Sequence, residues 1–440
     1  MQLRFACFSL LLALELLTLG AEEPPLAAAP MDTILLRPNV WQSTAQELDP
    51  AWSSLGFAWI SANQDAARSA LPGLVFQKRS LEEALLSFRD GKLAEAKLFY
   101  FNRGDSGTLR EDQFKELLAG ITADLSALTG RQAVERGRDA GGAVKAEGRR
   151  WETEHTRYLL EWSVTKESRV RAIPFRAEFI RLLVRPSTSL PLPVGALPVP
   201  SRDRVREFAG RDHVERLAGG DVKLRDVPMV DQGEKGYCVV ASVERVLRYY
   251  GVAVDQHELA QIANSDAAGG TSMDAMLASL KKLTARLGVK VRALYEWNVR
   301  DFLKMLEDYN RAAKRGKLAP EIKFRGKAID ADAFFARIKP EIFKEVRTRN
   351  SADFGRFQRA IQRSIDEGVP LLWSVRLGIV AEKDIPQASG GHMRIIVGYN
   401  AATREILYSD SWGAGHEEKR MAIDDAWTVT TGLGSLQPVS

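Results

Sequence analysis

A cysteine stands between a glycine-containing turn and an apolar helical pattern in the segment Asp231-Gln232-Gly233-Glu234-Lys235-Gly236-Tyr237-Cys238. From Cys238 the apolar spacing predicts a helix that continues to Tyr250 and stops at Gly251. A thiol on the first turn of a helix lies at the positive end of the helix dipole, which favours the reactive thiolate. A lone cysteine is by default a small buried residue without reactivity, so this position alone leaves both interpretations open.

The other cysteine, Cys7, lies in a segment typical of an export signal. Arg4 precedes a mostly apolar stretch over residues 5–19. This pattern predicts a signal peptide over residues 1–20 and a secreted or periplasmic protein. Removal of the signal would leave Cys238 as the single thiol, which excludes an internal disulfide and a cysteine-based zinc site. No other apolar run reaches the roughly 18 residues of a membrane span, so none is expected in the mature protein.

Length and charge indicate two ordinary globular domains. The chain has 440 residues, of which 45% are hydrophobic and 27% charged, which is ample for large cores. Its 62 basic residues are interspersed with 57 acidic ones, so no nucleic-acid partner is expected. A proline-rich stretch over residues 186–202 predicts an extended linker between domains at 31–185 and 203–440. The sequence indicates no oligomeric state.

The N-terminal domain mixes helical and strand patterns. Strand patterns cover residues 94–101, 157–164 and 175–184, and helical spacing covers residues 112–128. These patterns predict an α+β domain. Its role stays open between recruiting a substrate, inhibiting the other domain and binding a partner.

The C-terminal domain also combines both kinds of element, with the strands gathered toward its end. A helix is expected through Val214 and Leu217, followed by a short strand that ends at Val230. Further along the chain the patterns predict helices over 256–263 and 273–287, a charged helical insertion over 298–350, and strands over 371–375, 393–399 and 406–408.

Four residues of this domain could together carry thiol chemistry. Hydrolysis of an amide by a thiolate needs a base, a group that orients the base, and donors for the oxyanion. Gln232 precedes Cys238 by six residues, so its amide could donate beside the Cys238 backbone N–H. His392 follows two glycines at the start of an apolar strand, where we expect it to be exposed to a cleft. Asp410 comes 18 residues later, past the next strand, and antiparallel pairing would bring it to His392.

These residues resemble the papain-like cysteine peptidases. In that family a Gln precedes the nucleophile by the same interval, and the motif Asn-Ser-Trp-Gly carries the orienting residue. Here the corresponding segment is Asp410-Ser411-Trp412-Gly413, with Asp in place of Asn. The resemblance implies an α+β fold in which the nucleophile helix packs on an antiparallel sheet. It also implies a Cys238, His392 and Asp410 triad with Gln232 as oxyanion donor.

A narrower branch is more similar still, the bacteriocin-processing peptidases that cleave double-glycine leaders. The similarity rests on the nucleophile helix, on Gly270-Thr271-Ser272 and on residues 287–291. Val239 departs from the Gly or Trp that usually follows the nucleophile, which leaves the shape of the subsites open. The family shields the histidine with a tryptophan, a position that Trp412 matches. We assign Trp412 and Gly391 to substrate binding, with a peptide or protein as substrate.

Other interpretations compete with this one. Each of the four residues alone is more often a turn, core or surface residue than a catalytic one. His257 and His416 compete for the role of base, but His257 lies within a predicted helix and His416 follows Asp410 in the chain. No His-Glu-x-x-His or Gly-x-Gly-x-x-Gly motif occurs, so neither a metal nor another cofactor is expected. A peptidase fold that only binds peptides, and an acyl transferase that uses the same thiol, remain alternatives.

Overall fold

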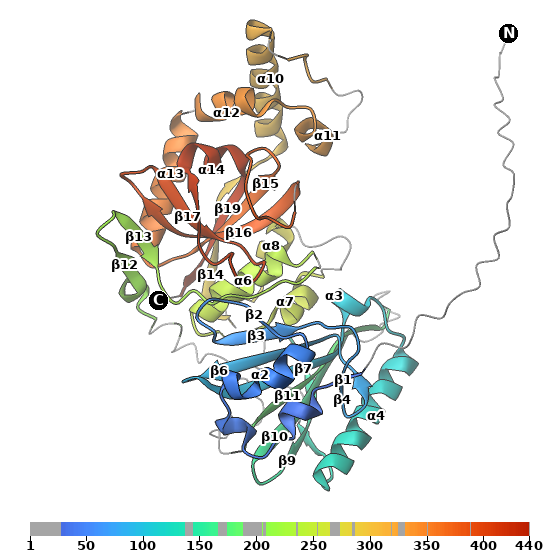
Figure 1. Cartoon of the computed structure of the whole chain (residues 1–440). Helices are drawn as coiled ribbons and strands as arrows, with labels where there is room; N and C mark the ends of the chain where they lie inside the picture. Colours follow the sequence, from blue (N-terminus) through green and yellow to red (C-terminus); the bar gives the residue numbers. More distant parts are fainter. Residues whose placement is uncertain are drawn as a thin grey trace, which may run out of the picture.

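The chain folds into two regions, each built around its own sheet and core, as a computed structural model shows (Figure 1). The N-terminal region is coloured blue to green and the C-terminal region green to red (Figure 1). The structure describes residues 28–136, 144–165, 174–187, 205, 208–234, 236–252, 254–264, 273–283, 287–317, 319–323, 331–349, 351–387 and 389–439. The expected signal peptide and most of the expected linker lie outside these residues.

The N-terminal region is built on an eight-stranded antiparallel sheet. Its strand order is β2-β3-β6-β7-β11-β10-β9-β8. The strands are β2 (Ala58–Trp59), β3 (Ala66–Ser69), β6 (Glu83–Arg89), β7 (Lys92–Asn102), β8 (Val134–Arg136), β9 (Glu147–Glu152), β10 (Thr156–Thr165) and β11 (Arg176–Pro186). A small sheet of β1 (Ala29–Pro30), β4 (Leu74–Phe76) and β5 (Arg79–Ser80) lies beside it (Figure 1).

Helix α4 (Glu111–Thr129) packs against β9 and β11. It buries Phe114, Ile121 and Leu125, which share one face because they are seven and four residues apart. Gly130 ends the helix in the left-handed conformation (φ 63°) that favours glycine. The short helices α1 (Asp32–Leu35), η1 (Val40–Gln42), α2 (Ala45–Ser54) and α3 (Arg103–Ser106) complete the region. The sequence-based predictions for residues 94–101, 112–128, 157–164 and 175–184 are confirmed as β7, α4, β10 and β11.

The C-terminal region is a sheet buried on both faces. Its main strand order is β12-β13-β16-β15-β19-β14, and β17 and β18 extend it beside β16. The strands are β12 (Val214–Arg216), β13 (Asp221–Leu224), β14 (Val289–Glu296), β15 (Leu371–Leu377), β16 (Gly390–Asn400), β17 (Glu405–Ser409), β18 (Lys419–Ala422) and β19 (Thr430–Pro438). Because side chains alternate between the two faces of a strand, Met393 and Ile395 enter one core while Ile396 enters the other.

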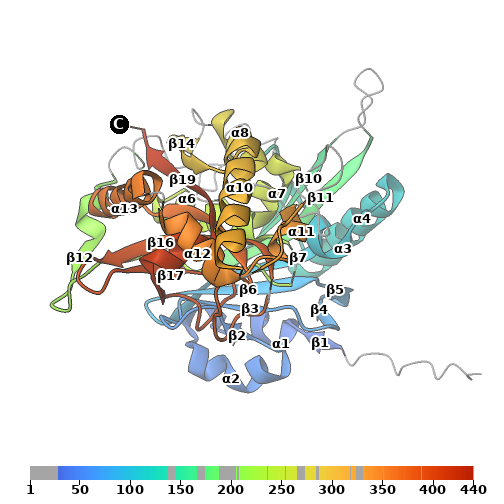
Figure 2. The ribbon, with the colours of Figure 1, turned by 90° about the horizontal axis from the view of Figure 1, so that it is seen from above.

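Helices cover both faces of this sheet. The first core contains side chains of α6 (Cys238–Tyr249), α7 (Gln256–Ala263) and α8 (Met273–Lys281). The second is covered by α13 (Ser351–Asp366), α14 (Ile423–Val429) and the insertion helices α10 (Val299–Gly316), α11 (Ala331–Phe335) and α12 (Pro340–Arg349). The insertion projects away from the N-terminal region (Figure 1), and in the view from above its helices overlie the C-terminal sheet (Figure 2). This arrangement is the expected nucleophile helix packed on an antiparallel sheet.

Three sequence-based expectations in this region are wrong. Residues 214–217 are not helical: β12 pairs with β13 as a hairpin whose turn contains Gly220 at φ 87°. The pairing of β13 with β16 outweighs the weak helical spacing. The strand expected to end at Val230 stops at Leu224, and residues 225–230 have no strand pairing. The helix expected over 273–287 ends at Lys281.

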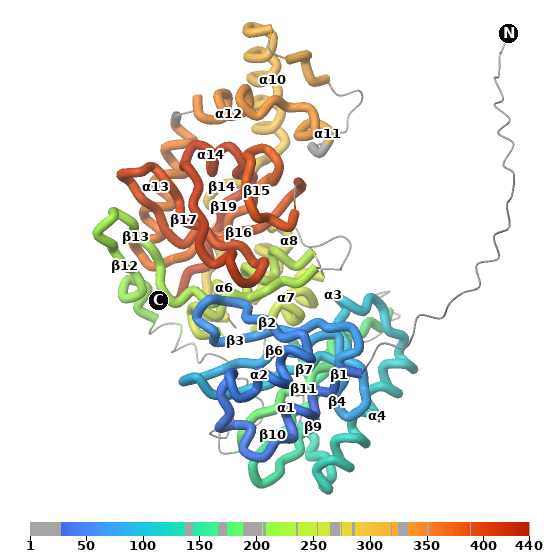
Figure 3. The backbone as a smooth tube through the Cα atoms, viewed as in Figure 1, coloured from blue at the N-terminus to red at the C-terminus, as the bar shows by residue number. Residues whose placement is uncertain are grey.

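The N-terminal sheet packs directly against the helix layer of the C-terminal region. Strand β11 and helix α3 contact α7, and the backbone trace shows α7 beside the blue and green strands (Figure 3). None of the described helices combines the length and apolar character that a bilayer crossing requires.

Candidate active site

Cys238 is the first residue of α6 and is partly exposed. The rest of the helix is held rigidly, since ten of its residues, from Val239 to Tyr249, are buried. Tyr237, the residue before the helix, is 1% exposed and packs against Gly104 of the N-terminal region. The thiol is therefore presented from a fixed helix start, where unpaired backbone N–H groups and the helix dipole favour negative charge.

His392 and Asp410 lie together on neighbouring strands. Antiparallel pairing of β16 with β17 sets Ile395 opposite Ser409, so residues just beyond this pair approach each other. The His392 Nε2 atom lies 2.9 Å from the Asp410 Oδ1 atom, and both side chains are fully buried. The other ring nitrogen, His392 Nδ1, is buried without a hydrogen-bond partner.

The indole of Trp412 covers the imidazole of His392. The two rings are stacked with centroids 4.0 Å apart and an angle of 9° between their planes. His392 is only 3% exposed, so the expectation that it faces an open cleft is wrong. The tryptophan that follows Asp410 keeps water from the His392–Asp410 contact, which strengthens its electrostatic attraction.

Contacts around His392 and Asp410 shift the pKa of each residue so that its charged form is favoured. Burial, the largest influence, disfavours the imidazolium, but the hydrogen bond with Asp410 and the electrostatic influence of the nearby Cys238 thiol raise the pKa of His392. Burial likewise disfavours the carboxylate, but the hydrogen bond from His392 and the charge of Arg394 lower the pKa of Asp410.

Gln232 is tied to the segment that follows Asp410. Its backbone N–H donates to the Ser411 carbonyl oxygen at 2.9 Å, and the Ser411 hydroxyl donates to Gln232 Oε1 at 2.7 Å. Because the amide oxygen accepts from Ser411, the NH₂ group points away from Ser411. Gln232 is 6% exposed. The side chain is thus held in one orientation beside the segment that carries Asp410.

Gly391 pairs with Arg376 at the start of β16 and is exposed. No atom lies within 4 Å of the position that a Cβ would take there, so the glycine leaves open space next to His392. The competing histidines have other partners. His257 binds Glu83 of the N-terminal region at 2.7 Å, and His416 contacts the edge of Trp412 at 5.5 Å.

Two buried arginines hold Asp410 and were not identified from the sequence. Arg394 Nε donates to Asp410 Oδ1 at 2.9 Å, and the same guanidinium contacts Glu382 at 2.9 Å. Arg245, on α6, donates to the Asp410 carbonyl oxygen at 2.7 Å and to the Ser409 hydroxyl at 2.6 Å. The available signal was a charged residue at position 394 inside an otherwise apolar strand. Burying such a charge is costly unless it is paired.

The N-terminal region contacts the segment that carries Gln232. Arg68 lies 3.7 Å from the Asp231 carboxylate and packs against Gly233, whose φ of 70° favours glycine. The Ala62 backbone N–H donates to Glu417 at 2.8 Å, in the loop after Trp412. Two loops beside the candidate site are therefore braced from outside the C-terminal domain.

A protein-family model matches most of the C-terminal region. The Peptidase_C39 like family matches residues 224–435, a span that contains Cys238, His392 and Asp410. Residues 224–435 belong to the Peptidase_C39 like family. This Peptidase_C39 like domain has the papain-like cysteine peptidase fold, preceded by a separate N-terminal region.

Two solved structures are distantly similar to the chain. One is the peptidase domain of Streptococcus ComA, a bifunctional ABC transporter involved in a quorum-sensing pathway, with 14% identity and a TM-score of 0.25 over 48% of this chain and 98% of that one. The other is xylellain, a cysteine protease from Xylella fastidiosa, with 12% identity and a TM-score of 0.27 over 53% of this chain and 90% of that one. No curated protein matches the chain.

No cluster of three or more His, Cys, Asp or Glu side chains in the described part of the chain is arranged to hold a metal ion.

Proposed function

We propose that the protein is an exported thiol peptidase that hydrolyses peptide bonds with Cys238 as nucleophile. His392 is the base and acid, Asp410 orients it, and Gln232 donates to the oxyanion. The proposal rests on the buried contact of 2.9 Å between His392 Nε2 and Asp410 Oδ1. The second ring nitrogen of His392, Nδ1, is buried and has no hydrogen-bond partner. Asp410 holds the Nε2 side of the ring, which leaves Nδ1 to exchange a proton with the thiol.

The reaction follows from these positions. The Cys238 thiolate attacks the peptide carbonyl, and the C–N bond breaks as His392 Nδ1 gives its proton to the leaving amine. The acyl group stays on sulfur as a thioester. Water, deprotonated by the same nitrogen, then attacks the thioester and releases the acid and the thiol.

The oxyanion of each tetrahedral intermediate needs two donors. The Cys238 backbone N–H at the start of α6 is one, and the Gln232 NH₂ group, oriented by Ser411, is the other. Trp412 keeps water from the buried side of His392, and the open space at Gly391 accommodates substrate backbone.

The test is a digestion of a diverse peptide mixture with purified protein, followed by mass spectrometry of the products. We expect new peptide ends with wild type and none with Cys238→Ala or His392→Ala. The matched variant Cys238→Ser should fold as well as wild type, as checked by thermal unfolding. Absence of cleavage by a correctly folded wild type over the whole mixture would favour the alternative of a peptide-binding protein.

Addition of an amine to the same reaction separates hydrolysis from acyl transfer. Hydrolysis predicts free carboxylates at the new ends even with amine present. Products that carry the added amine as an amide would identify an acyl transferase instead.

Export is part of the proposal and rests on Arg4 and the apolar stretch over residues 5–19. N-terminal sequencing of the protein recovered from the medium or the periplasm should begin after this stretch. A protein that stays in the cytosol with residues 1–20 intact would contradict export without touching the chemistry of the site.

A further inference from the structure

The hairpin of β2 and β3 in the N-terminal region reaches two loops beside the candidate active site. Strand β2 pairs with β3, and β3 pairs with β6, so the hairpin is part of the eight-stranded sheet. In the turn between the two strands, the Ala62 backbone N–H donates to Glu417, in the loop after Trp412. Arg68, on β3, contacts the segment that carries Gln232. One hairpin of the N-terminal sheet therefore supports both loops.

Gln232 lies in the middle of a short turn, and Arg68 contacts the residues on either side of it. The Gly233 backbone N–H donates to Asp231 Oδ1 at 2.8 Å, which closes the turn around Gln232. Arg68 Nη1 lies 3.7 Å from Asp231 Oδ2. A Cβ at Gly233 would lie 2.8 Å from Arg68 Nη2, so the guanidinium packs directly on this glycine. The guanidinium therefore restricts the positions that the turn can take.

Arg68 is itself fixed by a buried contact that returns to the C-terminal region. Its side chain is 15% exposed, and its Nε donates to Glu83 Oε2 at 2.9 Å. Glu83 is fully buried, and its other oxygen, Oε1, lies 2.7 Å from His257 Nε2 of α7. The contacts run from Asp231 through Arg68 and Glu83 to His257. The guanidinium is thus held between two segments of the C-terminal region.

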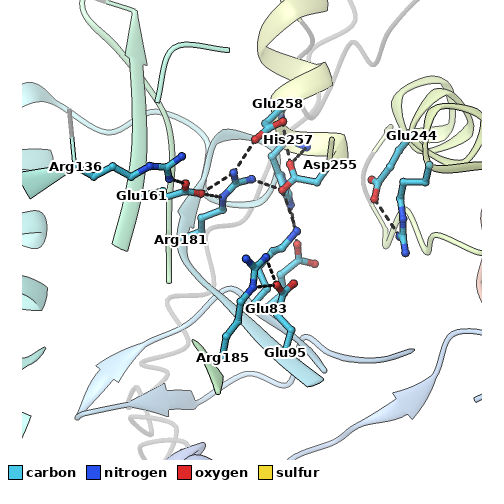
Figure 4. A network of polar contacts seen from close by, with 12 residues as sticks. Glu83, Glu95, Arg136, Glu161, Arg181, Arg185, Glu244, Asp255, His257 and Glu258 are labelled. Carbon is cyan, nitrogen blue, oxygen red and sulfur yellow. Dashed lines mark hydrogen bonds and ion pairs between the residues drawn. The ribbon is translucent and has the colours of Figure 1, made fainter. Parts of the chain in front are cut away.

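Further buried ion pairs join the two regions. Arg181 of β11 is 1% exposed and binds Glu161 of its own sheet. It also binds Asp255 and Glu258 of α7 (Figure 4). Lys97 of β7 reaches Asp255 at 3.3 Å. Because breaking buried pairs of this kind is costly, the hairpin stays in place beside the candidate site.

A third contact reaches the start of the nucleophile helix. Gly104 of α3 lies so close to Tyr237 that a Cβ there would be 2.4 Å from the Tyr237 hydroxyl oxygen. Tyr237 directly precedes Cys238, and Cys238 is partly exposed. These three contacts of the N-terminal region fall on neighbours of the candidate catalytic residues. An inhibitory segment would instead cover the thiol, so the arrangement favours support over inhibition.

We propose that the N-terminal region is a permanent part of the active site and that Arg68 is a positioning residue for Gln232. By fixing Asp231 and Gly233, Arg68 holds the turn where the Gln232 amide donates to the oxyanion. A donor that is already in place stabilises the transition state more than one that must first reorganise. The inference rests on the proposed function, because it needs Gln232 as oxyanion donor.

The expected loss is moderate, because the turn also has supports within the C-terminal region. The Gln232 backbone N–H donates to the Ser411 carbonyl oxygen, and Gln256 Nε2 donates to the Asp231 carbonyl oxygen at 3.2 Å. Removal of a whole oxyanion donor costs about 100- to 1,000-fold in kcat. Loss of Arg68 displaces the donor without removing it, so we expect kcat to fall about tenfold.

The test compares the full mature protein with Arg68→Met and with the matched variant Arg185→Met. Arg185 forms a similarly buried ion pair with Glu95 within the N-terminal sheet (Figure 4). On a peptide that wild type cleaves, Arg68→Met should lower kcat about tenfold and change KM less than about twofold, whereas Arg185→Met should change neither by more than about twofold. Thermal unfolding checks that each variant is folded. Equal losses of kcat in the two variants would overturn the proposal.

Asp231→Asn gives a second variant that leaves the buried Glu83 contacts intact. Asparagine keeps the Oδ1 atom that accepts from Gly233 and removes the charge that faces Arg68. We expect kcat to fall in this variant too, and no further loss when Asp231→Asn is combined with Arg68→Met. Wild-type kcat in Asp231→Asn, or additive losses in the double variant, would contradict a shared role of the two residues.

Alkylation of Cys238 by iodoacetamide separates a displaced oxyanion donor from a damaged nucleophile. Iodide leaves from a saturated carbon, so no oxyanion forms and Gln232 is not needed. Arg68→Met should therefore be alkylated at about the wild-type rate. Alkylation slowed as much as kcat would locate the damage at the thiol and overturn the proposal. A rise in both rates would show that the N-terminal region inhibits the thiol, which would also overturn it.

Amide hydrogen exchange measures the turn without any turnover. The Gln232 N–H is bonded to the Ser411 carbonyl oxygen and is protected while the turn is held. We expect it to exchange at least about tenfold faster in Arg68→Met than in wild type or Arg185→Met. Unchanged exchange in folded Arg68→Met would overturn the positioning role. If wild type cleaves no peptide, the proposed function fails, and this exchange rate still decides whether Arg68 holds the turn.

Discussion

Replacing Asp410 separates geometry from charge at the candidate site. Its Oδ1 atom accepts from His392 Nε2 and from Arg394 Nε, both at 2.9 Å, while Oδ2 has no partner. Asparagine keeps an oxygen in the Oδ1 position and places its NH₂ group where no bond existed. Alanine removes both hydrogen bonds, so His392 Nε2 loses its partner and Arg394 keeps only Glu382.

The expected magnitudes differ accordingly. A hydrogen bond to a charged group contributes about 1.5–3 kcal/mol, and breaking a buried ion pair costs about 3–5 kcal/mol. We therefore expect Asp410→Ala to lower the free energy of unfolding by about 3–5 kcal/mol and Asp410→Asn by about 1–2 kcal/mol. With its orienting group gone, His392 should lose position, and Asp410→Ala should reduce kcat about 100-fold. Asp410→Asn should reduce kcat less than tenfold, because it preserves the orientation.

The assay pairs urea denaturation with kcat and KM on any peptide that wild type cleaves. Both variants are compared at a temperature at which each is more than 95% folded, so that loss of fold is not read as loss of catalysis. If Asp410→Asn lost as much kcat as Asp410→Ala, the carboxylate charge rather than its geometry would be decisive. The reasoning from the two bonds on Oδ1 would then be refuted.

Three further predictions test the surroundings of the site and the domain interface. Arg394→Gln should lower the free energy of unfolding by about 3 kcal/mol. It should also reduce kcat more than it raises KM, because Arg394 acts through Asp410. An effect on KM alone would argue against a positioning role of Arg394. Glu244, with its pKa raised from 4.5 to about 7, stabilises the fold fully below pH 4.5, and this stability is lost as the pH rises through 7. Glu244→Gln should remove up to about 3 kcal/mol of the decline in the free energy of unfolding between pH 4.5 and 8, measured by urea denaturation at several pH values. If the decline is the same in the variant and in wild type, groups other than Glu244 cause it. Arg181→Met should lower the free energy of unfolding by about 3–5 kcal/mol, because it removes the guanidinium that binds three buried carboxylates. Arg110→Met, at an exposed ion pair, should leave the free energy of unfolding nearly unchanged. Equal effects of the two substitutions would show that these charges do not hold the interface.

Local patterns predicted the elements that carry the site. The helix from Cys238 and the strands β15, β16 and β17 follow from apolar spacing and length, which are properties of neighbouring residues. The approach of His392 to Asp410 followed from antiparallel pairing of consecutive strands. Their catalytic roles remain a prediction. The resemblance implied that Trp412 shields His392, but local spacing alone did not predict that His392 is buried, because this depends on how the segment after β17 packs on β16.

The contacts between the two regions could not be predicted in the same way. Arg181 and Asp255 are 74 residues apart, and nothing in the spacing of either marks the other as its partner. Arg394 and Arg245 look like ordinary basic residues until the strand and the helix that carry them are packed. The proline-rich stretch predicted an extended linker between two domains but gave no information on their contacts, and buried ion pairs hold the described parts of the two regions together.

The central claim, that Cys238 is a thiolate nucleophile paired with His392, is tested most directly by covalent labelling. Purified mature protein is incubated at mildly acidic pH with an epoxide inhibitor of thiol proteases, and labelled residues are found by peptide mapping. We expect complete modification of Cys238 in wild type and modification at least tenfold slower in His392→Ala. Equal labelling rates in the two proteins, or an unlabelled Cys238 in the folded wild type, would contradict the account.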